Sequence, residues 1–357
     1  MKKALLVLED GTVYIGKSFG KEGTAFGEVV FNTCMTGYQR IITDPSYRGQ
    51  IVVMTYPLIG NVGFNEEDSE SDECQVSGFI VKELCDMPSN WRCRQDPKSY
   101  FEDHGVVGIC DIDTRHLTRH IRKYGSMAGV ITTDTDADPK DLAAKASGLS
   151  KEHRDYVDTV TIKAIRHMEG SGPRIAIVDL GVKKSLVSSL AQYGCELFIM
   201  PAYSSAEEIL SQNPDGILFS GGPGSPAHIP YAIETAQKLI GKKALMGIGL
   251  GHQLLGLALG GQAYKLKFGH HGGNHPVKDL IHNKIKMTSQ NHSYALEEDI
   301  CSGAVITHVN LHDNTVEGFS HRDYPIIGLQ YDPESLAGPS GFDEVLTEFI
   351  NLAKKQS

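Results

Sequence analysis

The chain has 357 residues, a formal net charge of −10, and 40% hydrophobic against 22% charged residues. This length allows two ordinary domains, each with its own core. The negative balance argues against a general nucleic-acid binder, and no apolar run approaches the ~20 residues of a membrane-spanning helix. We therefore expect a globular protein that binds neither nucleic acid nor membrane.

The amino terminus and the cysteines indicate a cellular compartment. The apolar run Ala4–Leu8 reaches the turn signal Asp10-Gly11 too soon for a signal peptide. Seven cysteines are scattered along the chain, and none forms a Cys-x-x-Cys pair. We expect reduced thiols in a cytoplasmic protein.

Residues 1–150 are rich in short β-type runs separated by turn signals such as Asp44-Pro45-Ser46. The runs are Ala4–Leu8, Val13–Ile15, Glu28–Phe31, Gln50–Thr55, Gln75–Val81, Val106–Ile109 and Gly129–Thr132. A helix is expected after a cap at Asp113, with Leu117, His120 and Ile121 on one face. These signals predict a β-rich α/β domain over residues 1–150.

A polar stretch follows this first domain. From Asp134 to Gly172 the chain has no strong core pattern, and it ends at Gly170-Ser171-Gly172-Pro173. We predict a linker over residues 151–172 and a second domain over residues 173–357.

From Arg174 the pattern changes to alternating strands and helices, which predicts a mostly parallel, doubly wound sheet. The expected strands are Ile175–Asp179, Glu196–Met200, Gly216–Ser220 and Ala244–Ile248, with helices around Val182–Gln192, Ser205–Ser211 and Tyr231–Ile240. Later strands without intervening helices indicate an antiparallel extension: Lys284–Thr288, Ala304–His308, Thr315–Phe319 and Ile326–Tyr331. A last helix carries a core-facing stripe of Phe342, Val345, Leu346, Phe349 and Ile350.

The segment Leu245–Gln253 is typical of a nucleophile elbow, in which a strand, a glycine-dense corner and a helix present one side chain above a sheet. Covalent catalysis requires Ser or Cys at the tip. This chain has Gly249 there.

Four segments in this order resemble the class I, triad-type glutamine amidotransferases: Ser220–Pro226, Gly247–Gln253, Thr288–Tyr294 and Leu329–Ser335. Four others are similar to the small chains of carbamoyl phosphate synthases: Val30–Gln39, Thr43–Tyr47, Tyr56–Gly63 and Lys267–Val277. The resemblance covers essentially the whole chain.

The resemblance implies a function and a partner. In that family a cysteine thiolate, activated by a histidine–glutamate pair, attacks the side-chain amide of L-glutamine. The ammonia passes to a large chain, which makes carbamoyl phosphate from bicarbonate and ATP for arginine or pyrimidine synthesis. ATP and Mg²⁺ thus belong to the large-chain partner of a heterodimer, and no cofactor is expected in this chain.

The resemblance also assigns site residues. The nucleophile position falls on Gly249, the base position on Asp332 and the third triad position on Glu334. The glutamine-contacting positions are Ser46, Gly222, Gly224, Leu250, Gln253, Asn291, Ser293 and Tyr294. Ser293 stands where glycine is usual, and Tyr294 where phenylalanine is usual. Backbone N–H groups at the Gly222 turn and at Leu250 would stabilise an oxyanion.

The first two triad positions depart from the pattern, so we predict that the glutaminase step is lost or severely impaired. Glycine cannot attack an amide, and Asp332 has no nucleophile to activate. Rescue by Cys195 or Cys301 is disfavoured because neither lies on the elbow. Two roles stay open: a small subunit in an ammonia-dependent assembly, or a regulatory protein that binds glutamine without hydrolysing it.

Several polar residues have simpler interpretations. His270, His271 and His275 suggest a metal cluster, but the surrounding glycines favour a structural loop, and we predict no metal site. We interpret His252 as a packed residue of the elbow rather than a base. Arg115, Arg119 and Arg122 are typical of a capped, solvated helix.

Overall fold

The computed structural model describes residues 2–150, 154–335 and 344–355. It divides into two compact units: Met1–Arg154 with Lys267–His271, and Asp155–Leu266 with Gly272–Ser357. The predicted linker over residues 151–172 begins at positions that are not described, and its extent stays a prediction. Within the described ranges, no helix is long and apolar enough to cross a membrane.

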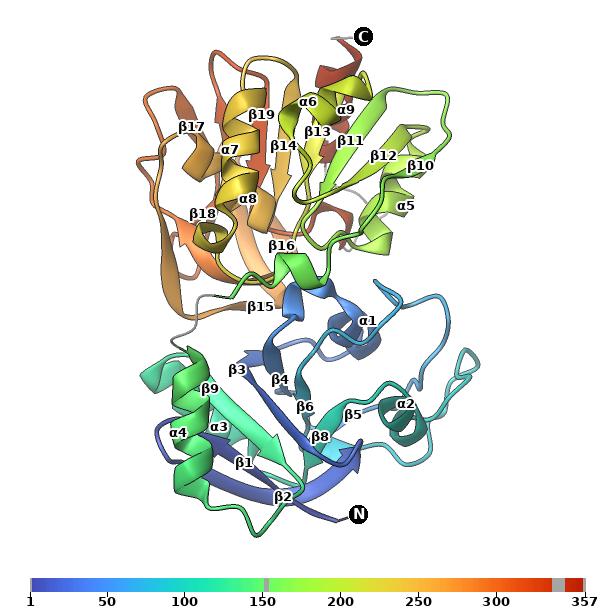
Figure 1. The fold of residues 1–357 in the computed structure, drawn as a ribbon, viewed down its shortest axis with the longest axis vertical. Coiled ribbons are helices and arrows are strands. Elements are labelled where there is room, and N and C mark those ends of the chain that lie inside the picture. Colours follow the sequence, from blue (N-terminus) through green and yellow to red (C-terminus); the bar gives the residue numbers. More distant parts are fainter. Residues whose placement is uncertain (1, 151–153, 336–343, 356–357) are drawn as a thin grey trace. The chain divides into compact units, whose positions relative to one another are not determined.

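Strands of the N-terminal unit close into a barrel, in the order β1-β2-β8-β6-β4-β3-β9 (Figure 1). Their bounds are β1 (Lys3–Leu8), β2 (Val13–Gly20), β3 (Thr24–Asn32), β4 (Gln50–Met54), β6 (Gly78–Ile80), β8 (Val107–Cys110) and β9 (Met127–Thr132). The short strands β5 (Leu58–Ile59) and β7 (Glu83–Leu84) pair separately. Each predicted run overlaps one barrel strand. The runs are recognisable because apolar residues alternate along these strands, and their side chains fill the barrel core.

Helices of this unit are α1 (Tyr38–Thr43), α2 (Pro97–Asp103), α3 (Thr114–Tyr124) and α4 (Pro139–Ser150), with a 3-10 turn at Pro45–Tyr47. Helix α3 begins as predicted: the Asp113 carboxylate accepts from the His116 N–H at 2.8 Å. Leu117 and Ile121 are fully buried in the core. His120 is only partly buried, and its ring nitrogen lies 2.6 Å from the Asp10 carboxylate instead of packing in the core.

Helix α4 corrects the expectation of a patternless stretch after Asp134. Asp138 accepts from the Lys140 N–H at 2.9 Å, and Pro139 begins the helix. Its apolar face is small, because it consists of Leu142 and alanines, and it packs on β1 and β9. So small a face is hard to recognise in a charged sequence.

The C-terminal unit contains one mixed sheet, in the order β10-β12-β11-β13-β14-β19-β18-β17-β15-β16. The bounds are β10 (Arg166–Met168), β11 (Arg174–Asp179), β12 (Glu196–Pro201), β13 (Gly216–Phe219), β14 (Ala244–Ile248), β15 (Ala263–Asp279), β16 (Lys284–Leu296), β17 (Ala304–Asn310), β18 (Val316–His321) and β19 (Ile326–Leu329). Strands β12, β11, β13, β14 and β19 are parallel neighbours, while β19, β18, β17 and β15 pair antiparallel. The predicted parallel sheet with an antiparallel extension is confirmed.

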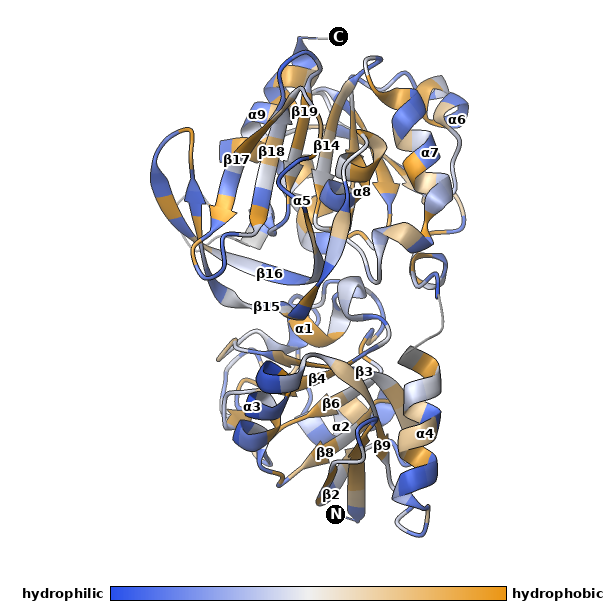
Figure 2. Ribbon diagram, turned by 90° about the vertical axis from the view of Figure 1, so that its left-hand side faces the viewer, coloured by the Kyte–Doolittle hydropathy of each residue, from blue (hydrophilic) through white to orange (hydrophobic). Residues whose placement is uncertain are grey.

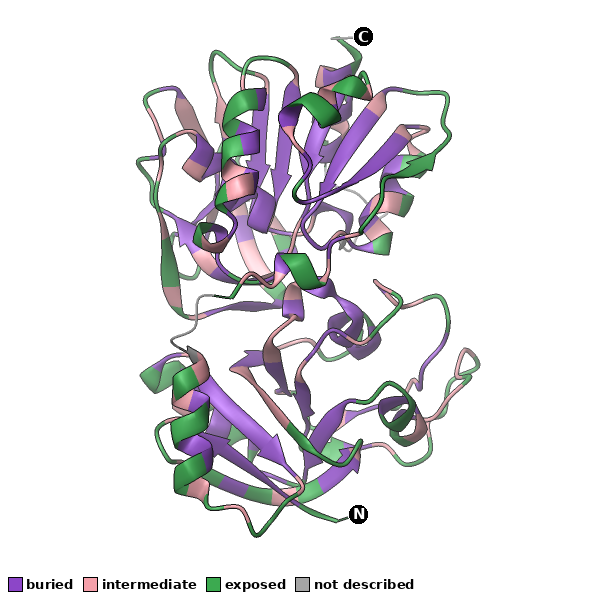
Figure 3. Cartoon of the chain, in the orientation of Figure 1, coloured by how far each residue is buried: buried purple, intermediate pink, exposed green. Residues whose placement is uncertain are grey.

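Helices cover both faces of the parallel strands. They are α5 (Lys184–Gln192), α6 (Ala206–Ser211), α7 (Pro230–Leu239), α8 (Leu250–Ala258) and α9 (Glu344–Lys354). One core cluster joins the sheet to α6, α7 and α8, and the other joins it to α5 and α9. Figure 3 shows the resulting pattern, with buried strands between helices that are exposed on their outer sides. The stripe on α9 is confirmed for Val345, Leu346, Phe349 and Ile350, whereas Phe342 lies outside the described residues.

Strand β15 corrects the interpretation of the histidine-rich segment as a loop. His270, His271 and His275 lie on this extended strand. The glycines around these histidines are typical of a turn, so the sequence does not indicate a strand here. Two of them, Gly269 (φ 70°) and Gly272 (φ 155°), adopt positive φ values within the strand. Extended backbone therefore continues through residues whose composition suggests a turn.

Candidate functional site

The predicted elbow is present. Strand β14 ends at Ile248, Gly249 has φ 55° and ψ −111°, and α8 begins at Leu250. The Gly249 N–H donates to the Leu329 carbonyl at 2.8 Å. Because β14 lies between β13 and β19 in the sheet, this corner opens at the carboxyl ends of parallel strands, where α/β proteins bind ligands.

The glycine-rich loop after β13 packs directly on the elbow. The Gly251 N–H donates to the Ser220 carbonyl at 3.1 Å, and the Ser220 hydroxyl accepts from the Leu180 N–H at 2.9 Å. Gly222 lies so close to the Leu180 carbonyl that a Cβ would collide with it. An ideal Cβ on Gly249 would lie 3.5 Å from the Gly221 Cα, an ordinary contact. A Cβ at position 249 would therefore meet no steric clash.

The start of α8 and the loop after β13 each contain one backbone position assigned by the resemblance. Leu250 occupies the first position of α8, where N–H groups have no acceptor within the helix. Gly224, in the loop after β13, has φ 86°, a conformation that favours glycine. These are the groups to which the resemblance assigns oxyanion and glutamine contacts.

Gln253 connects α8 to the neighbouring strand β16. Its side-chain amide donates to the Tyr294 carbonyl at 2.8 Å and to the Gln330 side chain at 3.0 Å. Asn291 and Ser293 lie on the same strand, and the Ser293 hydroxyl is buried with no hydrogen-bond partner in the part of the chain that the structure describes. Of the predicted glutamine-contacting residues, Gln253 and Tyr294 are thus joined by a hydrogen bond.

Ser46 belongs to the N-terminal unit, unlike the other assigned residues. It lies on the 3-10 turn Pro45–Tyr47, and its N–H donates to the Asp44 carboxylate at 2.8 Å. Its assignment to the glutamine pocket stays a prediction.

The remaining triad positions contact a lysine that the sequence analysis does not identify. Lys183, which immediately precedes α5, has its ammonium 2.8 Å from the Asp332 carboxylate and 2.6 Å from that of Glu334. The Glu334 side chain is fully buried, and those of Lys183 and Asp332 are 8% and 18% exposed. No spacing rule points to Lys183, because its partners lie far along the chain.

One ammonium thus faces two carboxylates. Burial raises the pKa of Glu334, because a desolvated carboxylate is disfavoured, while the Lys183 charge acts in the opposite direction. Asp332, in the position of the base, is engaged by Lys183. It is not a free proton acceptor for a group on the elbow.

His252, directly on the elbow helix, is fully buried against Phe319, with ring centroids 5.2 Å apart. Burial lowers its pKa to about 3, so the imidazole is neutral at physiological pH. The structure supports its interpretation as a packed residue.

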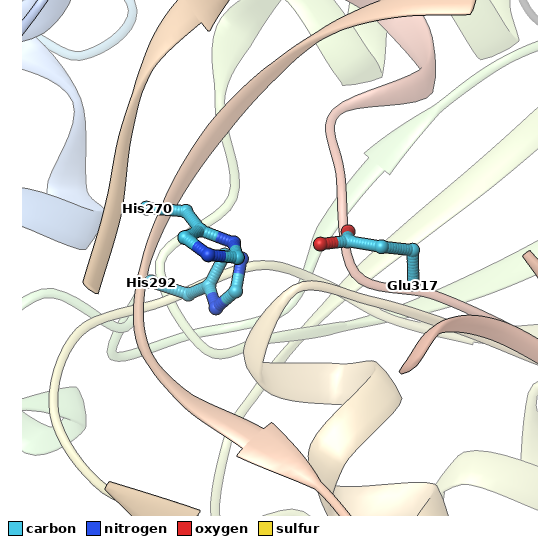
Figure 4. A group of neighbouring side chains, drawn as sticks. All are labelled: His270, His292 and Glu317. Atoms are coloured by element: carbon cyan, nitrogen blue, oxygen red, sulfur yellow. The ribbon is translucent and has the colours of Figure 1, made fainter. Parts of the chain in front are cut away.

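A buried hydrogen-bond network connects β16, β17 and β18. His292 contacts the Gln290 side-chain oxygen at 3.1 Å, and the Gln290 amide donates to the Glu317 carboxylate at 3.0 Å. Asn310 donates to the same carboxylate at 3.0 Å. Figure 4 shows His292 and Glu317 with His270, which belongs to the N-terminal unit. Within the C-terminal unit, His292 and Glu317 are thus both engaged by amide side chains.

The other predicted metal ligands have different neighbours. The His271 ring lies 6.3 Å from that of Tyr47 in the N-terminal unit, and the His275 ring lies 5.8 Å from that of His312 in the C-terminal unit. The absence of a metal site stays a prediction.

Comparisons with known proteins cover nearly the whole chain. The family described as "Carbamoyl-phosphate synthase small chain, CPSase domain" matches residues 6–131, and "Glutamine amidotransferase class-I" matches residues 176–352. The carbamoyl phosphate synthase small chain of Clostridium acetobutylicum is 46% identical, over 98% of this chain and 100% of its own length. That of Syntrophotalea carbinolica is 47% identical, over 99% of this chain and 98% of its own length. The chloroplastic small chain of Arabidopsis thaliana is 41% identical, over 99% of this chain and 86% of its own length.

We expect the change Lys183→Met to destabilise the fold, because it leaves a buried carboxylate without a counter-charge. The free energy of unfolding, measured with denaturant, should fall by about 3–5 kcal/mol at neutral pH. Since burial raises the folded-state pKa of Glu334, this loss should shrink as the pH falls and the carboxyl group takes up a proton. The double change Lys183→Met/Glu334→Gln should recover part of it. An equal loss at pH 8 and pH 5 would contradict this account.

We expect Gly249→Ala to cost about 1–3 kcal/mol of unfolding free energy, because a side chain is strained at φ 55° and ψ −111°. Gly148→Ala is the matched control. Gly148 lies in α4 with nothing within 4 Å of an added Cβ, so this change should stabilise the protein by about 0.5–1 kcal/mol. Equal effects of the two changes on thermal unfolding would show that the elbow is unstrained.

Proposed function

The chain belongs to the carbamoyl phosphate synthase small-chain family, and from this membership we propose that it is an amidotransferase subunit without a working glutaminase step. One observation carries the proposal: the elbow is intact, but its tip is Gly249. The subunit would complete a synthase that takes its nitrogen from free ammonia.

The chemistry explains why this substitution is decisive. The carbon of an amide is a poor electrophile, so hydrolysis through an acyl-enzyme needs a strong nucleophile and a base. Gly249 offers no nucleophile, and Asp332 is held by Lys183 at 2.8 Å. The Leu250 N–H and the loop after β13 would still polarise a bound carbonyl. In a serine protease, loss of a triad of this kind costs on the order of 10⁶-fold in rate.

The intact N-terminal unit supports a role in an assembly. Its barrel is closed and its core is filled, although no residue assigned to the triad lies in it. A stand-alone glutamine sensor has no evident use for such a unit. We therefore propose a cytoplasmic heterodimer with the large chain, which would hold ATP and Mg²⁺ and serve arginine or pyrimidine synthesis.

The second candidate is a regulatory protein that binds L-glutamine without hydrolysing it. It is favoured by the retained pocket, in which Gln253 is fixed to Tyr294 and Gln330. Saturable glutamine binding together with no affinity for a large chain would support this role and contradict the first.

We expect glutamate release from glutamine to be near background in the wild-type protein and to be restored by Gly249→Cys/Asp332→His. Each single change should restore little, because nucleophile and base act as a unit. Asp332→His also removes one of the two carboxylates that contact Lys183. The control is Gly249→Ala/Asp332→His, which carries the same backbone strain but no thiol. Substantial turnover by the wild type, or by this control, would refute the proposal.

We expect the wild-type chain to form a complex with a carbamoyl phosphate synthase large chain in gel filtration at micromolar concentrations. The purified complex should make carbamoyl phosphate from ammonium, and glutamine at the same concentration should support a rate near background. Failure to form a complex would exclude the subunit role. Efficient use of glutamine would exclude the loss of glutaminase activity.

A further inference from the structure

One face of α3 is strongly basic. Arg115, Arg119 and Arg122 follow one another at spacings of four and three residues, which places them on the same side of the helix. All three are exposed, whereas Leu117 and Ile121 are buried in the barrel core. Figure 2 shows the hydrophilic colouring of α3. We call these three residues the α3 arginine face.

The α3 arginine face lines a groove of about 870 Å³. The lining also includes Thr55 and Pro57, which follow β4, and Lys82, which follows β6. Asp113 is the only carboxylate in the lining, and it is engaged in capping α3 at 2.8 Å from the His116 nitrogen. The groove therefore combines four cationic side chains with one anionic group.

The charges of the α3 arginine face are not balanced internally. Lys82 lies 3.3 Å from the Asp111 carboxylate, but none of the three arginine side chains makes an ion pair or hydrogen bond within the ranges that the structure describes. The chain as a whole carries a net charge of −10, so this concentration of positive charge is local. Such a patch repels itself in the free protein and is stabilised by an acidic surface.

The groove favours a macromolecule over a small anion as its occupant. Its arginines are exposed, and tight small-anion sites place their cations in enclosed positions. We propose that the α3 arginine face docks against an acidic segment of the large chain. This inference rests on the proposed subunit function, and it assigns one interface of that assembly.

The test is the affinity of the full-length chain for the purified large chain, measured by calorimetry at two salt concentrations. Arg115→Glu/Arg119→Glu should raise the Kd about tenfold or more, because attraction becomes repulsion. The matched control is Lys140→Glu/Lys145→Glu, which reverses two exposed charges on α4 of the same unit and should change the Kd by less than about twofold. Added salt should weaken the wild-type complex more than that of the arginine variant.

The outcomes separate this inference from the function on which it rests. If the wild type forms no complex, the subunit function fails and the inference with it. If the wild type binds and the arginine variant binds equally well, the docking inference alone is overturned. It is also overturned if pyrophosphate binds the wild type at micromolar concentration and does not bind the arginine variant, while both proteins bind the large chain with the same Kd. The neutral variant Arg115→Gln/Arg119→Gln, whose Kd should be intermediate, provides the measurement if the charge reversal prevents folding.

Discussion

The corner between β14 and α8 is held by backbone hydrogen bonds and by close packing of glycines. The N–H groups of Gly249 and Gly251 donate to carbonyls of neighbouring segments of the sheet, at Leu329 and Ser220. Gly251 itself lies so close to the Phe219 carbonyl that it has no room for a side chain. None of these interactions involves a side chain at position 249. The backbone of the elbow is therefore held in place independently of the residue at position 249.

Asp332, the residue that the resemblance assigns to the base position, also changes the electrostatics of the site. An aspartate in place of the base brings a second carboxylate beside the buried Glu334, which would be unfavourable without a cation nearby. Lys183 supplies that cation to both groups. The result is a compact cluster of one ammonium and two carboxylates. These contacts link the segment that follows β19 to the start of α5.

Much of the fold is predictable from the sequence because its strands and helices bury regular apolar patterns. The runs at Ala4–Leu8 and Ala244–Ile248 are examples, and the elbow is recognisable from its glycines alone. Helix α4 is not, since its buried face is made mainly of alanine. Strand β15 is not, since glycines interrupt it. At the site, the positions of Gly249, Asp332 and Glu334 follow from the family resemblance. The contact of Lys183 with two of them depends on tertiary packing, which no local pattern records.

The closed barrel restricts how the N-terminal unit can meet another protein. Strand β1 pairs with both β2 and β9, so the first strand of the chain seals the ring. A ring of this kind presents no free row of main-chain donors and acceptors to which a visiting strand can attach. Another protein can therefore recognise the barrel wall only through its side chains. Specificity would then evolve by substituting surface residues, without any change to the register of the sheet.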